Sequence, residues 1–450
     1  MKTELLKFKT LSLLLLAFFI GTALLAAKDI EKSKSYTYSQ KFSEDGQFNL
    51  KAHSDQVILN SWNKNEVKII ATVRAEAENE SDIEALFKDI TLKPKASENQ
   101  IDLSNSLFIN QKADYEIGSF LRINTGNTKK VELSNGEKIK LKNLRVKYEI
   151  FLPVKTRLNL RSSYGQVKII GDLMGETSFD FHSTSFTAEN LGRTKISLKY
   201  GTAKFISLKD AKLALFEGDM SFEKGRELEI NSKYSKLKIN QANKITLTSF
   251  EDKIKIERLD ELEANMKYGN LEIKESRFID LSIAYELEVD LGKVEQLKSA
   301  NSKYSSYNIN KVEDLLFAQS FEDRLSINSV RRINLNGKYG GLSIDKLALS
   351  CEVMGFETDV NIKSISEDFR RININGKYMD IDLQTPNVAY GFQSKITYGD
   401  VKYNSADFNI IQEIKKGETK EIQMTRKAAK DAQDAARISI YGYESEVVLR

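Results

Sequence analysis

Apolar and polar residues alternate with a period of two along most of this 450-residue chain, and short breaks interrupt the alternation at regular intervals. Ile245 and Leu247 precede one such break, and Ile254 and Ile256 follow it. This spacing is typical of strands that bury one face. Gly, Ser, Asn and Asp gather in the breaks and predict turns. The pattern therefore predicts an all-β fold of short strands.

An aromatic residue marks each break. The phrase Tyr-Gly or Tyr-Ser, mostly after Lys, returns about every 35 residues, and an aromatic residue followed by Glu lies midway between its copies. The first phrase contains Tyr164, Tyr200, Tyr234, Tyr268, Tyr304, Tyr339 and Tyr398, and Tyr378, which Met379 follows, occupies the same place in the series. The intervening aromatic residues are Phe181, Phe216, Phe250, Tyr285, Phe321 and Phe356. Steps of 16 to 19 residues, and of 22 and 20 at the end, indicate a solenoid of stacked turns.

The charges beside the aromatic residues distinguish a turn of about 17 to 18 residues from one of about 35. Six odd repeats carry Lys before the tyrosine: Lys199, Lys233, Lys267, Lys303, Lys338 and Lys377. Five even repeats carry Glu after the aromatic residue: Glu217, Glu251, Glu286, Glu322 and Glu357. In the longer turn, like charges would stack about 4.8 Å apart and repel by about 1 kcal/mol per pair even in water. The shorter turn makes Lys and Glu neighbours, so we favour it.

A second column consists of asparagines three positions before the tyrosines: Asn231, Asn265, Asn301, Asn336 and Asn375. Amides at a repeated corner can bond the turn backbone, and aromatic rings at a fixed register can pack as a ladder. We assign both columns a structural role. The alternatives are an asparagine face that binds sugar and an aromatic platform that stacks on carbohydrate. The residues that bind a ligand are not identified by the pattern.

The segments on either side of the repeats follow a different pattern. Residues 28–160 predict a β-rich N-terminal capping region, with a turn at Asp45-Gly46, one short helix around Ile83, Leu86 and Phe87, and a hairpin at Asn135-Gly136. The repeats occupy residues 161–409, and residues 410–450 predict a C-terminal cap. Within that cap, Lys427 to Ala436 predicts a polar loop or a short helix.

Residues 1–27 predict a signal peptide. Lys2, Lys7 and Lys9 precede an apolar run from Leu11 to Ala27, which is shorter than a typical membrane span. We therefore expect export to the periplasm or the cell surface, with no membrane span after cleavage. The cleavage motif is imperfect, and the alternative is an uncleaved inner-membrane anchor.

Composition narrows the partners. The net charge is +4, and without the first 27 residues it falls to +2, with 65 basic and 63 acidic residues. This balance gives no bulk field for nucleic acid or anionic lipid. Cys351 is the only cysteine, which rules out an intrachain disulfide. It lies in an alternating strand and is expected to be a small buried residue, with a reactive thiol as the alternative.

Candidate catalytic chemistry is sparse. The chain has two histidines, His53 and His182, and its best polar clusters are Asp180-Phe181-His182 and Asp380-Ile381-Asp382, which read first as strand-surface residues. Catalytic triad order, metal-ligand spacing and a phosphate loop are not evident. We expect a non-enzyme without a cofactor. A polysaccharide hydrolase or lyase stays an alternative because β-helices can host such sites.

Several segments together resemble one family. They are Phe48-Asn49-Leu50, the run from Val57 to Ile69, the acidic helix expected near residue 83, Tyr148 to Pro153, and Ser163-Tyr164-Gly165-Gln166-Val167. The chain is similar to the bacterial putative-adhesin family of β-strand repeats, a domain of unknown function related in style to head-GIN auto-transporter adhesins. The resemblance implies a single-stranded, right-handed parallel β-helix, adhesion, and no catalytic residues. The family's Gly-Asp turn is Tyr-Gly or Tyr-Ser here, and Asp400 alone restores it after Tyr398-Gly399.

The expected function is therefore that of an exported, non-enzymatic adhesin or envelope scaffold that binds glycan or protein along its ladder. The alternative is a periplasmic or membrane-anchored sensing partner. The ligand, the binding face and the oligomeric state are not determined by the sequence.

Overall fold

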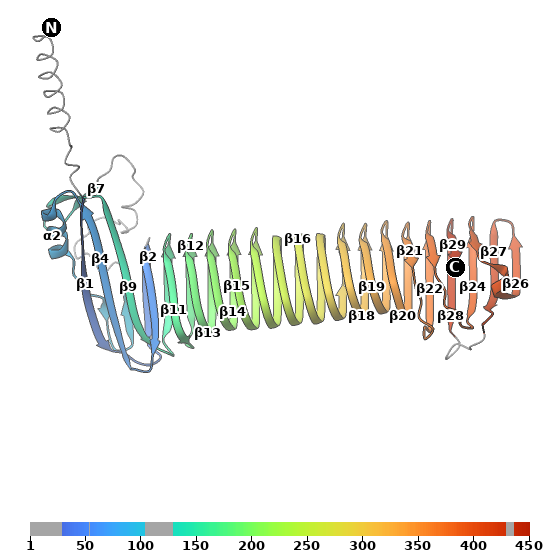
Figure 1. Ribbon diagram of the computed structural model, residues 1–450, viewed down its shortest axis with the longest axis horizontal. Coiled ribbons are helices and arrows are strands. Elements are labelled where there is room, and N and C mark those ends of the chain that lie inside the picture. The colour runs from blue at the N-terminus through green and yellow to red at the C-terminus, as the bar shows by residue number, and fades with distance from the viewer. Residues whose placement is uncertain (1–28, 54, 104–128, 429–435) are drawn as a thin grey trace, which may run out of the picture.

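The computed structural model describes residues 29–53, 55–103, 129–428 and 436–450, and they form a long rod of stacked strands (Figure 1). The rod is a β-solenoid with rungs of about 18 residues. Strand β13 (Ser185–Lys199) pairs in parallel with β14 (Thr202–Phe216), and Lys199 lies across from Phe216, 17 positions further along the chain. The predicted all-β fold and the shorter of the two turn lengths are confirmed.

Parallel pairing of each turn with the next continues along the rod body. Its strands are β10 (Arg157–Ser163), β11 (Gln166–Leu173), β12 (Thr177–His182), β15 (Asp219–Lys233), β16 (Lys236–Ser299), β17 (Ser302–Lys303), β18 (Ser306–Phe321), β19 (Arg324–Lys338), β20 (Gly341–Phe356) and β21 (Asp359–Ile362). The 64 residues of β16 pass through several turns without a break in strand structure.

The alternation found in the sequence fills the core of each turn. In β14, six apolar side chains point inward and are at most 5% exposed, while Lys204, Lys209 and Lys212 face solvent. The six are Ala203, Phe205, Leu208, Ala211, Leu213 and Leu215. Each buried large apolar side chain contributes about 1.5–3 kcal/mol. Cys351 is fully buried between Ile333 and Ile372 of the neighbouring turns, as the strand alternation predicts.

Antiparallel strands close the N-terminal end of the rod. Strands β1 (Ile30–Lys41), β4 (Glu66–Ala77) and β9 (Asn143–Pro153) lie side by side, and β9 then pairs in parallel with β3 (Gln56–Trp62). Helix α2 (Glu80–Asp89) lies beside them. It buries Ile83, Leu86 and Phe87, as predicted.

The first turn of the stack lies between β1 and β4 in the sequence. Strands β2 (Gln47–His53) and β3 pair with β10 and β11, so residues 47–53 lie against 157–163 and residues 56–60 against 166–170. The predicted hairpin consists of β7 (Lys129–Glu132) and β8 (Lys138–Leu141), with Gly136 at φ 84° in its turn. The short strands β5 (Lys95–Ala96) and β6 (Gln100–Asp102) extend the edge of β2.

At the other end, the chain fills its turns out of sequence order. Strand β28 (Arg437–Tyr443) lies between β22 (Arg371–Lys377) and β24 (Gly391–Thr397), and it is parallel to both. Strand β29 (Glu446–Leu449) lies in the same way between β23 (Asp380–Leu383) and β25 (Asp400–Lys402). Figure 1 accordingly places the C-terminus within the rod.

A hairpin follows β25 and ends the stack. After the 3₁₀ turn η2 (Ser405–Asp407), β26 (Phe408–Lys416) and β27 (Thr419–Arg426) pair in antiparallel fashion, and β27 adds to the edge of β24. Most of the loop or helix predicted at 427–436 lies outside the described residues, as does the predicted signal peptide at 1–27.

Candidate binding surfaces

The chain changes direction at one corner of every turn through a residue with left-handed backbone geometry. Tyr200 has φ 56° and Glu217, one turn later, has φ 47°. The same alternation of Tyr and Glu continues along the rod to Tyr378. Side chains other than glycine and asparagine adopt this geometry at a cost of about 1–2 kcal/mol each. The corner therefore needs a compensating contact in every turn.

Aromatic rings supply that contact. Sixteen rings form one row in which each touches the next edge to face, with centroids 5.3–6.0 Å apart and planes at 64–87°. In order, they are His53, Tyr164, His182, Tyr200, Phe216, Tyr234, Phe250, Tyr268, Tyr285, Tyr304, Phe321, Tyr339, Phe356, Tyr378, Tyr443 and Tyr398. We call this row the aromatic corner. All seven tyrosines assigned to a ladder belong to it.

The aromatic corner zigzags between two columns of residues. Phe216 lies across from Lys199 and Lys233, while Tyr200 and Glu217 occupy the next position along the chain. Lys and Glu therefore meet on the diagonal rather than directly across, and the described residues contain no ion pair between the Lys and Glu of this corner. Lys and Glu are thus neighbours on adjacent turns, as the shorter turn requires, and like charges lie two turns apart.

The ends of the aromatic corner differ from the sequence prediction in two ways. Phe181 is not a member: it is 1% exposed and packs on Phe186 in the core, while His182 takes the place in the row. At the other end Tyr398 does not contact Tyr378, because Tyr443 of β28 lies between them. Both histidines of the chain are members, although the repeat in the sequence is marked by Tyr and Phe.

The asparagine column does not stack on itself. Asn231 lies between Ala214 and Thr248, and Asn336 and Asn375 lie on either side of Met354. Consecutive members of the column are thus two turns apart, as the short turn requires. Asn231, Asn265 and Asn375 are exposed, and Asn301 and Asn336 are half-buried.

Buried carboxyl groups lie just inside the aromatic corner. Asp252 accepts hydrogen bonds from the backbone N–H of Ser235 (2.7 Å) and the hydroxyl of Ser249 (2.6 Å). Asp323 repeats this arrangement with Ser305 and Ser320. Burial raises the pKa of both carboxyls, and these hydrogen bonds oppose the rise.

Asp252 and Asp323 each follow an aromatic residue and Glu in the sequence, and the acidic character of that phrase gives no sign of their burial. The available signal was the order of small residues on successive turns: Tyr-Ser comes one turn before each Asp, and Tyr-Gly one turn after it. The serine supplies a donor, and the glycine leaves room for the Asp backbone. A Cβ on Gly269 would lie 2.2 Å from the carbonyl oxygen of Asp252.

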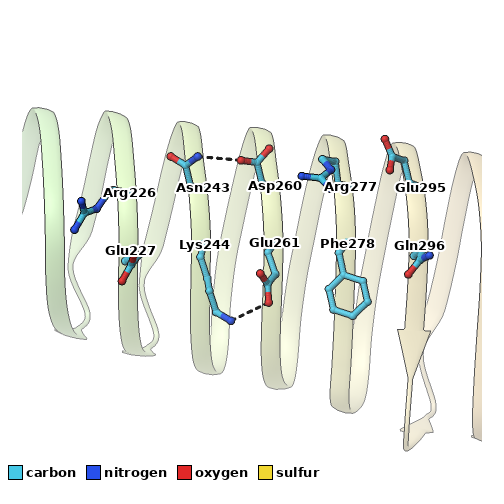
Figure 2. Close-up of a pocket in the computed structure, with 10 residues that line it drawn as sticks. All are labelled: Arg226, Glu227, Asn243, Lys244, Asp260, Glu261, Arg277, Phe278, Glu295 and Gln296. Carbon is cyan, nitrogen blue, oxygen red and sulfur yellow. Dashed lines mark hydrogen bonds and ion pairs between the residues drawn. The ribbon is translucent and has the colours of Figure 1, made fainter.

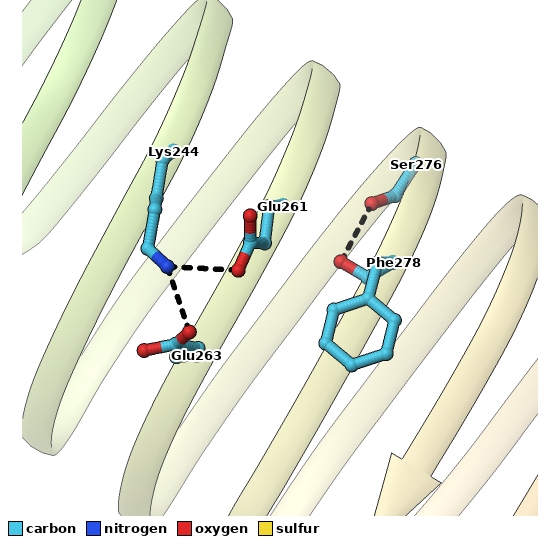
Figure 3. Close-up of polar contacts among 5 residues, drawn as sticks. All are labelled: Lys244, Glu261, Glu263, Ser276 and Phe278. Carbon is cyan, nitrogen blue, oxygen red and sulfur yellow. Dashed lines mark hydrogen bonds and ion pairs between the residues drawn. The ribbon is translucent and has the colours of Figure 1, made fainter.

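A second corner of the turns carries stacked charges, and a groove of about 740 Å³ runs across five of its turns (Figure 2). We call it the charged corner. It includes the ten residues that line the groove, together with Asp210, Asp314 and Arg332 on the turns before and after them. Lys244 donates to Glu261 (2.8 Å) and to Glu263 (2.7 Å), and Figure 3 shows the three side chains together. These contacts raise the pKa of Lys244 above its usual value. The amide of Asn243 donates to Asp260 at 2.9 Å.

The described residues contain neither a metal-binding cluster nor a helix suited to cross a membrane. Residues 29–53, 55–103, 129–428 and 436–450 contain no group of three or more His, Cys, Asp or Glu side chains arranged to hold a metal ion. Of the polar clusters noted in the sequence, Asp180 is exposed and Asp382 binds the guanidinium of Arg450 at 2.9 Å. Across the same residues, no helix has both the length and the apolar character that a membrane crossing requires.

Comparison with known proteins adds little to this geometry. No family model and no curated protein matches the chain. Among solved structures, a putative cell adhesion protein from Clostridium sporogenes is 10% identical over 93% of this chain and 99% of its own, with a TM-score of 0.15. A putative lipid binding protein from Parabacteroides distasonis is 13% identical over 76% and 94%, with a TM-score of 0.17. Both scores are too low to transfer a fold or a function.

Proposed function

We propose that this chain is an exported, non-enzymatic adhesion or scaffold protein that binds a linear glycan along the aromatic corner. The supporting observation is the unbroken row of rings, whose exposed tyrosines present between 38% (Tyr164) and 56% (Tyr398) of their surface. Aromatic rings offer an apolar body and, in tyrosine, a hydroxyl, which suits the two kinds of surface that a sugar presents. The row repeats every turn, about 4.8 Å.

A row of weak, equivalent contacts favours a polymer over a small molecule. Each exposed ring adds a modest contact, and contacts made by linked units on the same rod act together through effective concentration. A chain-like ligand that engages several turns would therefore bind far more tightly than its monomer unit.

The binding test is affinity electrophoresis in gels that contain a soluble polysaccharide, with laminarin, amylopectin and alginate as probes. We expect retardation of the wild-type chain in at least one gel. A triple variant with Tyr234→Ala, Tyr304→Ala and Tyr339→Ala should lose that retardation. The corresponding Tyr→Phe triple variant keeps the ring contacts, so it separates lost binding from lost folding.

A matched control removes exposed apolar area without touching a ring. Ile206, Ile283 and Met354 are 51%, 40% and 57% exposed. Their triple substitution by alanine should leave the retardation unchanged. If the tyrosine and control variants migrate alike in every gel, the aromatic corner does not bind these glycans.

The location of the chain in the cell distinguishes the proposed function from the alternative of a periplasmic sensing partner. Protease treatment of intact cells should release fragments of the rod if the chain is displayed on the surface. Protection until the outer membrane is opened would favour the periplasmic role instead. An antibody against an exposed stretch such as β26 would follow the fragments.

A further inference from the structure

Within the part of the chain that the structure describes, two successive turns of the charged corner lack any ion pair or side-chain hydrogen bond among their outward side chains. On other turns, charged side chains bind a partner on the neighbouring turn: Arg226 binds Asp210 (2.5 Å), and Arg332 binds Asp314 (2.7 Å). Lys244 does the same with Glu261. In such pairs the polar groups of the surface already have hydrogen-bond partners, so they do not need a ligand.

The interruption covers two successive turns, which carry Arg277-Phe278 and Glu295-Gln296 (Figure 2). Across the described residues, the side chains of Arg277, Glu295 and Gln296 form no hydrogen bond or ion pair, and all three are exposed. A phenyl ring stands where the preceding turns have Glu227, Lys244 and Glu261. Free polar groups and an aromatic ring therefore share one end of the groove.

Phe278 offers a usable face. Its side chain is half-buried, which fixes the ring against the rod, and its face is turned toward the viewer in Figures 2 and 3. The ammonium of Lys298 lies 5.1 Å from the ring centroid, and Lys298 itself is exposed. An exposed cation–π contact of this kind is weak. A ligand that stacks on the ring can therefore displace the lysine.

The charges around the ring balance, because Arg277 and Lys298 are matched by two carboxylates, so no net field favours an anionic ligand. Carboxylates occupy the same column on the turns on both sides of Arg277, Asp260 on one and Glu295 on the other (Figure 2). An incoming anion would meet these carboxylates as well as the guanidinium. A neutral ligand that carries many hydroxyl groups can instead donate to Glu295, accept from Arg277 and do both with Gln296.

We propose that Arg277, Phe278, Glu295 and Gln296 form a binding site for one neutral sugar unit of a glycan, with the pyranose ring stacked on Phe278. The site lies on the charged corner and is independent of the aromatic corner, so either can fail without the other. It is local, because the pairing of charges resumes at Asp314 and Arg332.

The test uses cellohexaose, maltohexaose and chitohexaose as neutral probes and hexagalacturonate as an acidic one. Saturation-transfer NMR detects contact, and calorimetry gives the affinity of the full chain. We expect at least one neutral hexaose to bind with Kd below about 10 mM. Phe278→Ala should weaken that binding by about tenfold or more, since a stacking contact is lost. Arg277→Met should weaken it in the same direction.

Three further variants keep the result interpretable. Phe278→Trp preserves a stacking surface, should retain binding, and adds a fluorophore at the site, whereas the single natural tryptophan, Trp62, lies in the N-terminal cap. Phe250→Ala removes a ring of the aromatic corner and tests whether the hexaose binds there instead. Ile206→Ala, at an exposed position outside both corners, should leave hexaose binding intact.

Three outcomes would overturn the site. They are binding of none of the neutral hexaoses, unchanged affinity in Phe278→Ala, and binding of hexagalacturonate alone. Loss of binding in Phe250→Ala but not in Phe278→Ala would place the sugar on the aromatic corner and likewise end this proposal.

Discussion

The rings of Tyr200 and Phe216 meet edge to face, with centroids 5.6 Å apart and planes at 84°, although they occupy different positions in their turns. Tyr200 sits at the left-handed corner residue, whereas Phe216 is the residue just before the corner. A tyrosine at the strained position thus gains two ring partners, one on each neighbouring turn. Ring contact and backbone strain are coupled along the whole rod.

Removal of one ring should therefore weaken the stack. Tyr234 contacts Phe216 and Phe250 at 5.8 and 5.6 Å. We expect Tyr234→Ala to lower the free energy of unfolding by about 1–3 kcal/mol, because two aromatic contacts are lost while the left-handed backbone remains. Urea titration followed by circular dichroism measures the change. Met354→Ala, at a site 57% exposed, is the control and should have little effect.

Relief of backbone strain at the Glu residues that occupy the corner between successive tyrosines should raise the free energy of unfolding. Glu217 has φ 47° and is exposed. Asparagine tolerates this backbone better than glutamate, so Glu217→Asn is expected to raise the free energy of unfolding by up to about 1 kcal/mol. Glu223→Asn, at an exposed strand position, should not stabilise. Equal effects of the two substitutions in thermal melts would contradict the role assigned to the corner.

Asp55 should make stability depend on pH. Burial raises the pKa of this carboxyl from 3.8 to about 7, and a hydrogen bond from the backbone N–H of His53 opposes the rise. The folded state holds the proton more tightly than the unfolded state, so this contribution is complete below pH 4 and is lost as pH rises toward 7. The loss is on the order of 4 kcal/mol at 1.36 kcal/mol per pH unit between the two pKa values.

Asp55→Asn removes the ionisation and keeps an oxygen that can accept from His53. We expect the variant to melt at a higher temperature than the wild type at pH 8 and at a similar temperature at pH 4. Asp180→Asn changes an exposed carboxylate and serves as the control. A wild-type melting temperature that does not fall between pH 4 and 8 relative to Asp55→Asn would count against the assignment.

Two adjacent glycines give a paired test of how closely the turns stack. A Cβ on Gly340 would lie 2.5 Å from the backbone oxygen of Asp323, whereas one on Gly341 would meet nothing within 4 Å. Gly340→Ala should cost about 1–3 kcal/mol, since one turn must move away from the next. Gly341→Ala should be neutral or stabilising by up to about 1 kcal/mol. Chemical denaturation of both variants decides the point.

The repeat could be predicted because the forces that set it are local. Alternation in segments such as Ile245 to Ile256 defines a buried face, and the turn length follows from charges that recur at fixed spacing. The predicted turn of about 17 to 18 residues is correct. Lys199 avoids a like charge because it lies across from Phe216, not because it lies across from Glu217.

Other features depend on contacts that spacing alone does not encode. Phe181 and His182 are adjacent, and only the register of β12 decides which of them faces the core. Asp252 looks like a surface acid until the serines that donate to it are placed one turn before it and within its own strand. The interruption at Phe278 became visible only when the partners of the neighbouring turns were known.

The insertion of β28 between β22 and β24 determines the order in which this end can assemble. Turns that stack in chain order can add one after another, each on a finished edge. Here β24 cannot rest on β22, because the segment that separates them comes some 40 residues later in the chain. Stepwise growth from the N-terminal side therefore pauses after β22. It resumes only when the later strands arrive, which makes closure of this end a single concerted event that also resists unravelling from it.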